Sequence, residues 1–324
     1  MKKLKFIPVL AVAALLSACG SNGVSVKAPK FAKMGEEVSF EKFDEEINKR
    51  FDELDFLKED LLNSKTLVGK GSSLVSEKMT RGKKTITEST MKDSDEAKYE
   101  LDMKNYIAKM SGESKEEVIN KSNSTNSKST SNDKGVYYVQ EAEYEGQKYL
   151  ANVDSANKLV ELMMPLSETV KAETYLDQIG KQSITQSVQL PSLKYLLSIM
   201  ATWTEEEFEG YKFYQNGNTF TYTYSYEETN EQKDADDNLA LTYTTKVEEK
   251  CQYVLEGSHV KFAKSSEELQ KVEFAVDYTS DPSILAKAGD VYEEIYNVYR
   301  EAEAKDAKVS LKAAKTDGFN FVIA

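Results

Sequence analysis

Histidine is almost absent from this chain, since His259 is the only one among its 324 residues. A Ser-His-Asp triad depends on a histidine base, and protein zinc sites draw their ligands largely from histidine and cysteine. The composition therefore excludes a two-histidine metal site and gives no positive sign of an enzyme. We expect no catalytic, cofactor or metal site, and we expect His259 to be a strand residue near a turn.

Cysteine is nearly as scarce, with only Cys19 and Cys251. If Cys19 is modified as argued below, Cys251 has no partner, and a disulfide framework is excluded even in an oxidising compartment. A free cysteine in a strand-like stretch usually acts as a small apolar side chain. We expect Cys251 to be buried or half-buried rather than a reactive thiol.

The apolar run at the start of the chain is too short to span a membrane. Phe6–Leu16 has about 11 residues and contains Pro8, whereas a spanning helix needs roughly 20. Three lysines precede this run, and small residues and a cysteine follow it. A cationic start, an apolar middle and a small-residue cleavage site are the three parts of a secretory signal.

The tetrapeptide Leu16-Ser17-Ala18-Cys19 at that cleavage site resembles the lipidation box of bacterial lipoproteins. The resemblance implies that a diacylglycerol is attached to the Cys19 sulfur and that residues 1–18 are removed. Cys19 would then be the first residue of an extracytoplasmic chain held to the cell membrane by its lipid. The alternative is an ordinary cleaved signal with an incidental cysteine nearby.

Positive charge is scarce relative to negative charge, with 42 Lys and Arg against 55 Asp and Glu, which gives a formal net charge of −13. Without the three lysines of the signal the net charge is −16. Such an acidic chain lacks the basic patch that nucleic acid requires, and it is not attracted to anionic lipid headgroups. We expect no nucleic-acid partner, and we expect membrane attachment to depend on the acyl chains.

The pattern of apolar residues predicts a short tether, a helix and then strands. Residues 19–35 are small and polar, as expected of a flexible tether. A helix capped by Ser39 is predicted next, because apolar residues recur there in steps of three and four up to Leu61. From about Leu74 to Leu162 the period becomes two, which predicts an antiparallel meander.

Several connections are expected within this first meander. Asp93–Asp95 is predicted to be a turn, and a change of phase near Asn105 predicts a bulge or bend. Asn120–Gly135 contains almost only Ser, Asn, Thr and Lys, which favours a mobile loop. Glu145-Gly146 is predicted to turn a hairpin.

The second half of the chain repeats the order of helices and strands. Two helices are predicted at Pro165–Ile179 and Pro191–Trp203, separated by an extended segment, with Trp203 packed on the sheet. A second meander, about 211–279, contains hairpins at Asn216-Gly217 and near Gly257. A final helix is predicted for Asp290–Ala304, followed by a short strand at 319–323.

The aromatic side chains of the second meander are the candidate binding residues. One face of its second strand is wholly aromatic, and these side chains could form the core or line a partly wet groove. The possible ligand-lining residues are Phe220, Tyr222, Tyr224, Tyr226 and Phe274.

Two acidic clusters are weaker candidates. Asp234, Asp236 and Asn238 begin a calcium-loop pattern, but Leu239 and Thr245 stand where glycine and a bidentate glutamate are needed, so we expect a solvated loop. Glu205–Glu207 is expected to be a solvated turn.

The predicted fold is α+β, a large curved antiparallel sheet, resembling an unclosed barrel, packed on a few helices. We expect a single domain at 36–324. The order of elements in residues 36–304 is similar to that of bacterial lipoprotein carriers of the LolA and LppX type, which shelter an acyl chain. That resemblance implies a non-enzymatic binding protein or carrier for an apolar or lipid ligand. The alternatives are a surface interaction or structural lipoprotein without a small-molecule ligand, and a hydrolase.

Overall fold

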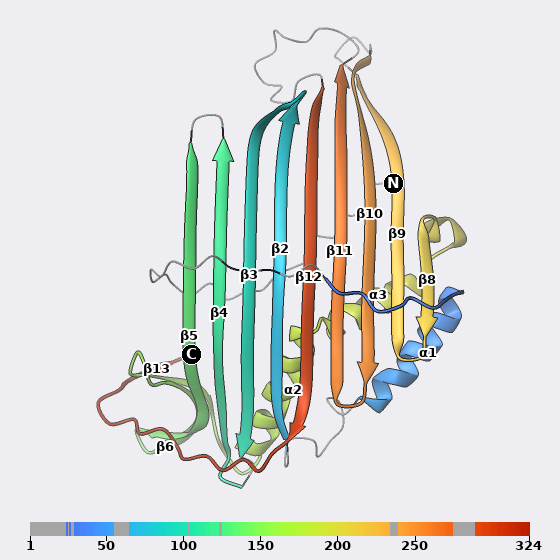
Figure 1. Ribbon diagram of the computed structural model, residues 1–324. Helices are drawn as coiled ribbons and strands as arrows, with labels where there is room; N and C mark the ends of the chain where they lie inside the picture. Colours follow the sequence, from blue (N-terminus) through green and yellow to red (C-terminus); the bar gives the residue numbers. More distant parts are fainter. Residues whose placement is uncertain are drawn as a thin grey trace.

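A computed structural model describes residues 24, 26, 29–54, 65–102, 104–122, 125–233, 239–274 and 289–324 (Figure 1). Cys19, the predicted signal at residues 1–18 and the cluster at 234–238 lie outside these residues. The elements are β1 (Glu36–Val38), α1 (Phe40–Glu53), β2 (Lys65–Arg81), β3 (Lys84–Asp102), β4 (Ile107–Ser122), β5 (Asn126–Tyr144), β6 (Gln147–Asp154), β7 (Leu159–Pro165), α2 (Ala172–Ser187), α3 (Leu190–Met200), the 3-10 helix η3 (Glu205–Phe208), β8 (Tyr211–Asn216), β9 (Thr219–Lys233), β10 (Leu239–Glu256), β11 (His259–Phe274), β12 (Asp290–Asp306) and β13 (Asn320–Ile323).

The strands of the described residues form a single open sheet in the order β1-β8-β9-β10-β11-β12-β2-β3-β4-β5-β6-β7-β13. Neighbours are antiparallel, except that β13 runs parallel to β7. β12 lies between β11 and β2 and so joins the two runs of strands into one sheet. The prediction of a large unclosed antiparallel sheet with few helices is confirmed at this level.

The cross-strand register defines a helix face of the sheet. Tyr222, Cys251 and Val298 lie in one row across β9–β12, and side chains that lie directly opposite one another share a face. They belong to one buried cluster with Leu176 of α2 and Leu193 of α3. This face therefore forms the main core with the helices, which lie behind the lower half of the sheet in Figure 1.

The helices present their apolar residues to this core. The Ser39 side chain accepts a hydrogen bond from the Lys42 backbone N–H and caps α1, as predicted. Phe43, Ile47 and Phe51 form the buried stripe of α1. No helix among the described residues is long and apolar enough to cross a membrane.

A smaller core lies on the other side of the sheet, here called the opposite face. Ala151 and Val153 are buried with Val160 and Leu162, whereas Leu150, which alternates with them on β6, belongs to the main core. The tail of the chain covers this second cluster through partly buried residues. Those residues are Ala314, Phe319 and Phe321.

The half of the sheet that ends at the connections after Arg81, Ser122, Lys233 and Phe274 is here called the distal half. The helices do not reach it (Figure 1). The buried residues of β3 are confined to its other end, Tyr99–Asp102, and no residue of its distal stretch Lys84–Asp95 is buried. As far as the described ranges extend, the distal half is therefore a single layer of long strands.

Two predicted elements are wrong. Asp290–Ala304, expected to be a helix, is strand β12, because β11 and β2 offer it a partner along each side. Asn120–Gly135, expected to be a mobile loop, consists mainly of the ends of β4 and β5, paired from Ala108↔Val139 to Lys121↔Asn126. A polar segment can form a strand when the neighbouring strand supplies its backbone partners.

Some connections also differ from the prediction. Asp93–Asp95 lies inside β3, and the turn comes at Gly82. The phase change near Asn105 is a full turn between β3 and β4. The first predicted helix begins only after Pro165, at Ala172, and runs through most of the segment expected to be extended.

The predicted hairpins are present with small adjustments. The two-residue loop expected at Asn216-Gly217 is shifted by one position to Gly217-Asn218, since Asn216 pairs with Thr219. Gly217 has a φ of 58° and Asn218 is not among the residues of positive φ, which fits a turn that needs glycine only at its first central position. Glu145 and Gly146 both have positive φ, as a type I′ turn requires.

Candidate functional site

The predicted aromatic row on β9 passes from the core into the distal half. Phe220 is 0% exposed and Tyr222 is 8% exposed, whereas Tyr224 and Tyr226 are half-buried. Phe220 and Tyr222 are therefore core residues, which was one of the two roles that the sequence allowed for this row. Phe274 ends β11, and its side chain lies outside the described part of the chain.

Ring contacts make this row continuous. Phe220 meets Phe43 of α1 edge-on, with centroids 5.7 Å apart. Tyr224 stacks on Tyr211 of β8 at 4.3 Å and contacts Tyr226 at 5.4 Å. The aromatic row thus joins the helix-covered core to the part of the helix face that no helix covers.

Further half-buried apolar residues continue that uncovered surface on other strands. Tyr296, Val75, Met91 and Val118 lie directly opposite one another on β12, β2, β3 and β4. We call this set the open surface. It consists of Tyr226, Val247, Tyr292, Tyr296, Val75, Met79, Met91 and Val118, all half-buried.

Sequence reasoning missed most of the open surface. Tyr292 and Tyr296 were not recognised as part of this surface because their segment was expected to be a helix. Tyr292 and Tyr296 are four residues apart, a spacing that places them on one face of a strand as well as of a helix. The tyrosine and β-branched content of the segment was the available signal for a strand. Val75, Met91 and Val118 meet only through long-range register, which local patterns do not give.

A charged pair borders the open surface where it meets the core. Lys264 binds Glu249 with Nζ and Oε2 2.7 Å apart, and its ammonium group lies 5.8 Å from the Tyr296 ring centroid. Burial alone lowers the pKa of Lys264, but the neighbouring Glu249 carboxylate outweighs that effect and the net shift is upward. Burial raises the pKa of Tyr296, which keeps its hydroxyl neutral.

Three carboxylates cross the open surface in one row. Glu268, Glu294 and Glu77 lie directly opposite one another on β11, β12 and β2. The Tyr292 hydroxyl donates a hydrogen bond to Glu294 Oε2 at 3.4 Å. Burial, followed by the nearby carboxylates, raises the pKa of Tyr292 to about 12. The open surface is thus apolar with an acidic stripe.

Two surface hollows are lined by described residues, and charged side chains contribute to both linings. One, of about 300 Å³, lies beside Glu77 and Tyr292 in the distal half, where Ser89 donates a hydrogen bond to Asn120 at 2.8 Å. The other, of about 390 Å³, lies near Tyr106 and Glu173 at the start of α2. The first hollow lies away from the helices, and the second opens at the surface between β5, β6 and the start of α2.

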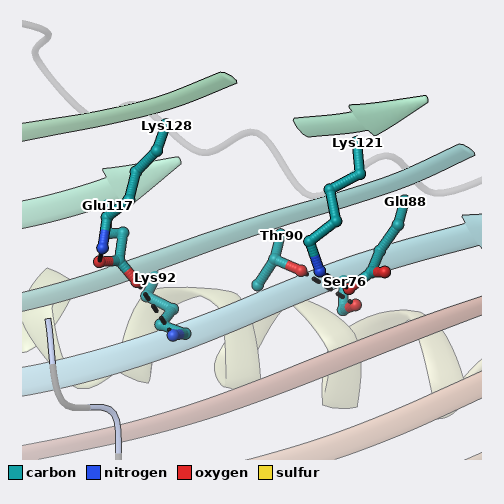
Figure 2. Close-up of polar contacts among 7 residues, drawn as sticks. All are labelled: Ser76, Glu88, Thr90, Lys92, Glu117, Lys121 and Lys128. Carbon is teal, nitrogen blue, oxygen red and sulfur yellow. Dashed lines mark hydrogen bonds and ion pairs between the residues drawn. The ribbon is translucent and has the colours of Figure 1, made fainter. Parts of the chain in front are cut away.

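The opposite face of the distal half differs in chemistry. Glu117 binds Lys92 and Lys128 from the two neighbouring strands, and Lys121 binds Glu88 (Figure 2). Glu113 likewise binds two lysines, Lys134 of the neighbouring β5 and Lys115 of its own strand. On β3–β5 this face thus neutralises its own charge across the strands.

The segment before β1 lies on the opposite face over β10. Ala32 exchanges two backbone hydrogen bonds with the Gln252 side chain, of 2.6 and 3.1 Å, and the Lys250 ammonium group lies 4.4 Å from the Phe31 ring centroid. The open surface, on the other side of the sheet, is not covered by these contacts.

The remaining candidate residues lie in the core, beside a turn or at the exposed start of a short helix. Cys251 is buried, as expected, and burial raises its pKa to about 12. His259 begins β11 beside a turn, as expected, and lies 2.7 Å from Glu301. Glu205–Glu207 forms the exposed start of η3, capped by Thr204. Within the described ranges, no three metal-ligating side chains converge.

Comparisons with known proteins do not assign a family. No family model matches the chain, and no curated protein matches it. The solved structures that it resembles include OccK7 (OpdD) of Pseudomonas aeruginosa, at 7% identity and a TM-score of 0.21 over 75% of this chain and 99% of that chain. Others are a mutant of the TodX monoaromatic hydrocarbon channel, at 8% identity and a TM-score of 0.22 over 76% and 91%, and an outer membrane channel of Pseudomonas putida F1, at 5% and 0.20 over 75% and 96%. TM-scores this low carry no argument, so a functional proposal depends on the chain's own residues.

Proposed function

We propose that this chain is a bacterial lipoprotein, anchored outside the cytoplasm by lipid on Cys19, that binds an apolar or lipid ligand on the open surface and catalyses no reaction. The observation that carries the proposal is the aromatic row, which leaves the core at Tyr222 and continues uncovered through Tyr224 and Tyr226. Half-buried tyrosine and methionine side chains suit a ligand that is apolar and adaptable in shape. In this proposal the sheet curves around its ligand as an unclosed barrel does.

The open surface is a better candidate than an internal cavity. Leu67, Leu176 and Leu190 are at most 2% exposed and belong to the same cluster as the aromatic residues at the start of β9. Protein interiors of this kind are packed at the density of organic crystals, so an acyl chain would have to displace these side chains. The ligand would therefore lie against the distal half of the helix face.

A matched pair of tyrosines on β12 tests the proposal. Tyr296 points to the helix face, and Tyr299, three residues later, points to the opposite face. The full chain is titrated with Nile red and with a fluorescent fatty acid, followed by lipid extraction of the purified protein. We expect Tyr296→Ser to weaken binding by roughly fivefold, since one aromatic contact contributes about 1 kcal/mol. Tyr299→Ser is the control and should bind as the wild type does. A protein that takes up neither probe and carries no lipid contradicts the proposal.

The second candidate is a surface interaction lipoprotein without a small-molecule ligand. The observation that favours it is the distal half, which in the described part of the chain is a single layer with no helix on either face (Figure 1). Such a surface suits a protein partner as well as a lipid. Cross-linking from an introduced photoreactive group at Tyr226 distinguishes the two, because a single protein adduct in cells favours this candidate.

A further inference from the structure

Among the described residues, no strand lies beside the outer edge of β9 in the distal half. β8 pairs with β9 only as far as Tyr211↔Tyr224, and the Ser225 N–H donates the last hydrogen bond on that side, to Gly210 O at 3.0 Å. From Tyr226 to Lys233, β9 pairs only with β10 among the described residues. An unpaired strand edge of this kind can accept an added strand.

The strand pattern fixes which backbone groups point outward along this edge. In an antiparallel ladder, alternate residues direct both N–H and C=O to the same side. Since Ser225 faces outward, Glu227, Thr229 and Glu231 also present their backbone groups to the free side. The eight residues from Tyr226 to Lys233 span about 27 Å, at roughly 3.4 Å per residue.

The side chains along this edge carry an excess of negative charge. Glu227 and Glu231 lie on the opposite face and Glu228 on the helix face. Glu228 and Glu231 lie opposite threonines, and Glu227 lies opposite Lys246, whose ammonium group forms its ion pair with Glu248 instead. The free edge of β5 differs, because its lysines Lys128 and Lys134 are bound by carboxylates of β4. Directly opposite charges stabilise neighbouring strands, so the β9 edge favours a strand that bears lysine or arginine.

The shape of the molecule excludes pairing of this edge with the free edge of β5 in a second copy, and the glutamates along β9 disfavour pairing of the edge with itself, because like charges would lie opposite one another. β8 and β1 continue outward beside the other half of β9, and β6, β7 and β13 do the same beside β5 (Figure 1). Two sheets joined edge to edge through β9 and β5 would bring these short strands into the same space. A single extended segment can lie along the edge beyond Gly210 without meeting them.

We propose that the free edge of β9, Tyr226–Lys233, binds an extended lysine- or arginine-bearing segment of another protein by strand addition. Backbone hydrogen bonds to Glu227, Thr229 and Glu231 hold the segment, and the three glutamates select its charge. This inference goes beyond the proposed function, because the edge is used by a protein segment whether or not the open surface holds a ligand.

The experiment uses the full chain in detergent and a labelled, end-capped octapeptide that alternates lysine with threonine or valine. Binding is followed by fluorescence anisotropy, and hydrogen exchange reports the amides of β9. We expect the peptide to bind, to slow exchange at Glu227, Thr229 and Glu231, and to lose its affinity when alternate amides are N-methylated. The N-methylated peptide keeps the charge but cannot extend a ladder.

Two variants of the protein separate charge from backbone pairing. Glu227→Lys with Glu231→Lys should weaken binding by about tenfold, because two favourable cross-strand pairs become repulsive. Glu267→Lys with Glu293→Lys makes the same charge change on β11 and β12, away from the edge, and should bind within about twofold of the wild type. Thr229→Pro removes one outward N–H at an edge position where proline is tolerated, and should also weaken binding.

Three results overturn the proposal. The first is no binding of the lysine peptide. The second is equal binding of its N-methylated form, or equal loss in both double variants, since either result means general attraction to an acidic chain. The third is concentration-dependent self-association in sedimentation that Thr229→Pro abolishes, because the edge would then be occupied by a second copy.

Discussion

Arg81 holds Asp290 through two parallel hydrogen bonds, Nε to Oδ1 at 2.6 Å and Nη2 to Oδ2 at 2.9 Å. The two residues lie opposite each other on β2 and β12, at the distal end of the junction between the two runs of strands. The Asp290 side chain is 3% exposed, so its carboxylate has exchanged water for the guanidinium group. We predict that Arg81→Leu lowers the urea midpoint of unfolding and that Arg81→Lys recovers only part of the loss, because lysine cannot make the paired contact.

The control for this prediction is an exposed ion pair of the same sheet. Lys246 and Glu248 lie 2.6 Å apart with both side chains at least half exposed. Lys246→Leu should leave the urea midpoint nearly unchanged, since exposed pairs contribute little. Equal shifts for Arg81→Leu and Lys246→Leu would show that the junction has no special role.

The acid stability of the sheet should depend on its cross-strand glutamates. Hydrogen bonds from Lys134 and then Lys115 lower the pKa of Glu113 from 4.5 to about 2. A carboxyl group whose pKa is depressed by folding stabilises the protein above its unfolded pKa, and that contribution is lost as the pH falls through the folded pKa. The contribution of Glu113 should therefore be full above about pH 4.5 and gone near pH 2.

The Glu113→Gln variant tests the direction of this pH dependence. The variant should be less stable than the wild type at neutral pH, and the difference should shrink as the pH falls toward 2. Urea unfolding at neutral pH and at pH values of about 4, 3 and 2 measures it. A difference that stays constant over this range would contradict the assigned ion pairs.

The buried thiol gives a chemical test of the main core. Cys251 is 1% exposed, and burial raises its pKa to about 12, so the thiolate is scarce at neutral pH. We predict that a thiol reagent does not modify Cys251 in the folded chain and modifies it fully in denaturant. Rapid modification of the folded chain would mean that β9–β11 open readily.

Local sequence patterns predicted most strands because their apolar residues alternate, and they failed where two periods overlap. In Asp290–Asp306, Val291, Ile295 and Val298 fit a helix, whereas Tyr292, Tyr296 and Val298 fit a strand. The segment forms a strand because β11 and β2 each offer it backbone hydrogen-bond partners. A local sequence pattern cannot indicate that these distant partners are available. The prediction for Asn120–Gly135 failed for the opposite reason. The segment has almost no apolar residues to mark it as a strand, but its Lys128 and Lys134 form ion pairs with glutamates of β4.

The candidate site was predictable only in part. The β9 row was found from its alternation, but its division into core and surface depends on how far the helices reach, which separates buried Tyr222 from half-buried Tyr226. The row of Tyr296, Val75 and Met91 draws on segments about 220 residues apart in the chain and depends on the register of β12 with β2.

The contact between α1 and the aromatic row should be a main source of stability. Phe43 is 0% exposed and touches both Phe213 and Phe220. We predict that Phe43→Ala lowers the free energy of unfolding by about 3–5 kcal/mol, because it removes a ring from a close-packed core. Tyr195→Ala, on the exposed side of α3 at 60% exposure, should change it by less than about 0.5 kcal/mol. Similar losses for the two variants would mean that α1 is not part of the core.

Acylation of Cys19 is the prediction on which the cellular placement depends. Each acyl chain contributes about 0.8 kcal/mol per buried CH₂, so two or three chains hold a protein firmly, whereas an acidic surface gives no attraction of its own. Cys19→Ala should therefore abolish labelling by a metabolically incorporated fatty acid and move the chain from the membrane fraction to the soluble fraction. Cys251→Ala is the matched control and should keep both the label and the membrane association. A Cys19→Ala chain that stays with the membrane would place the attachment in the folded sheet, and the open surface would then be the first region to mutate.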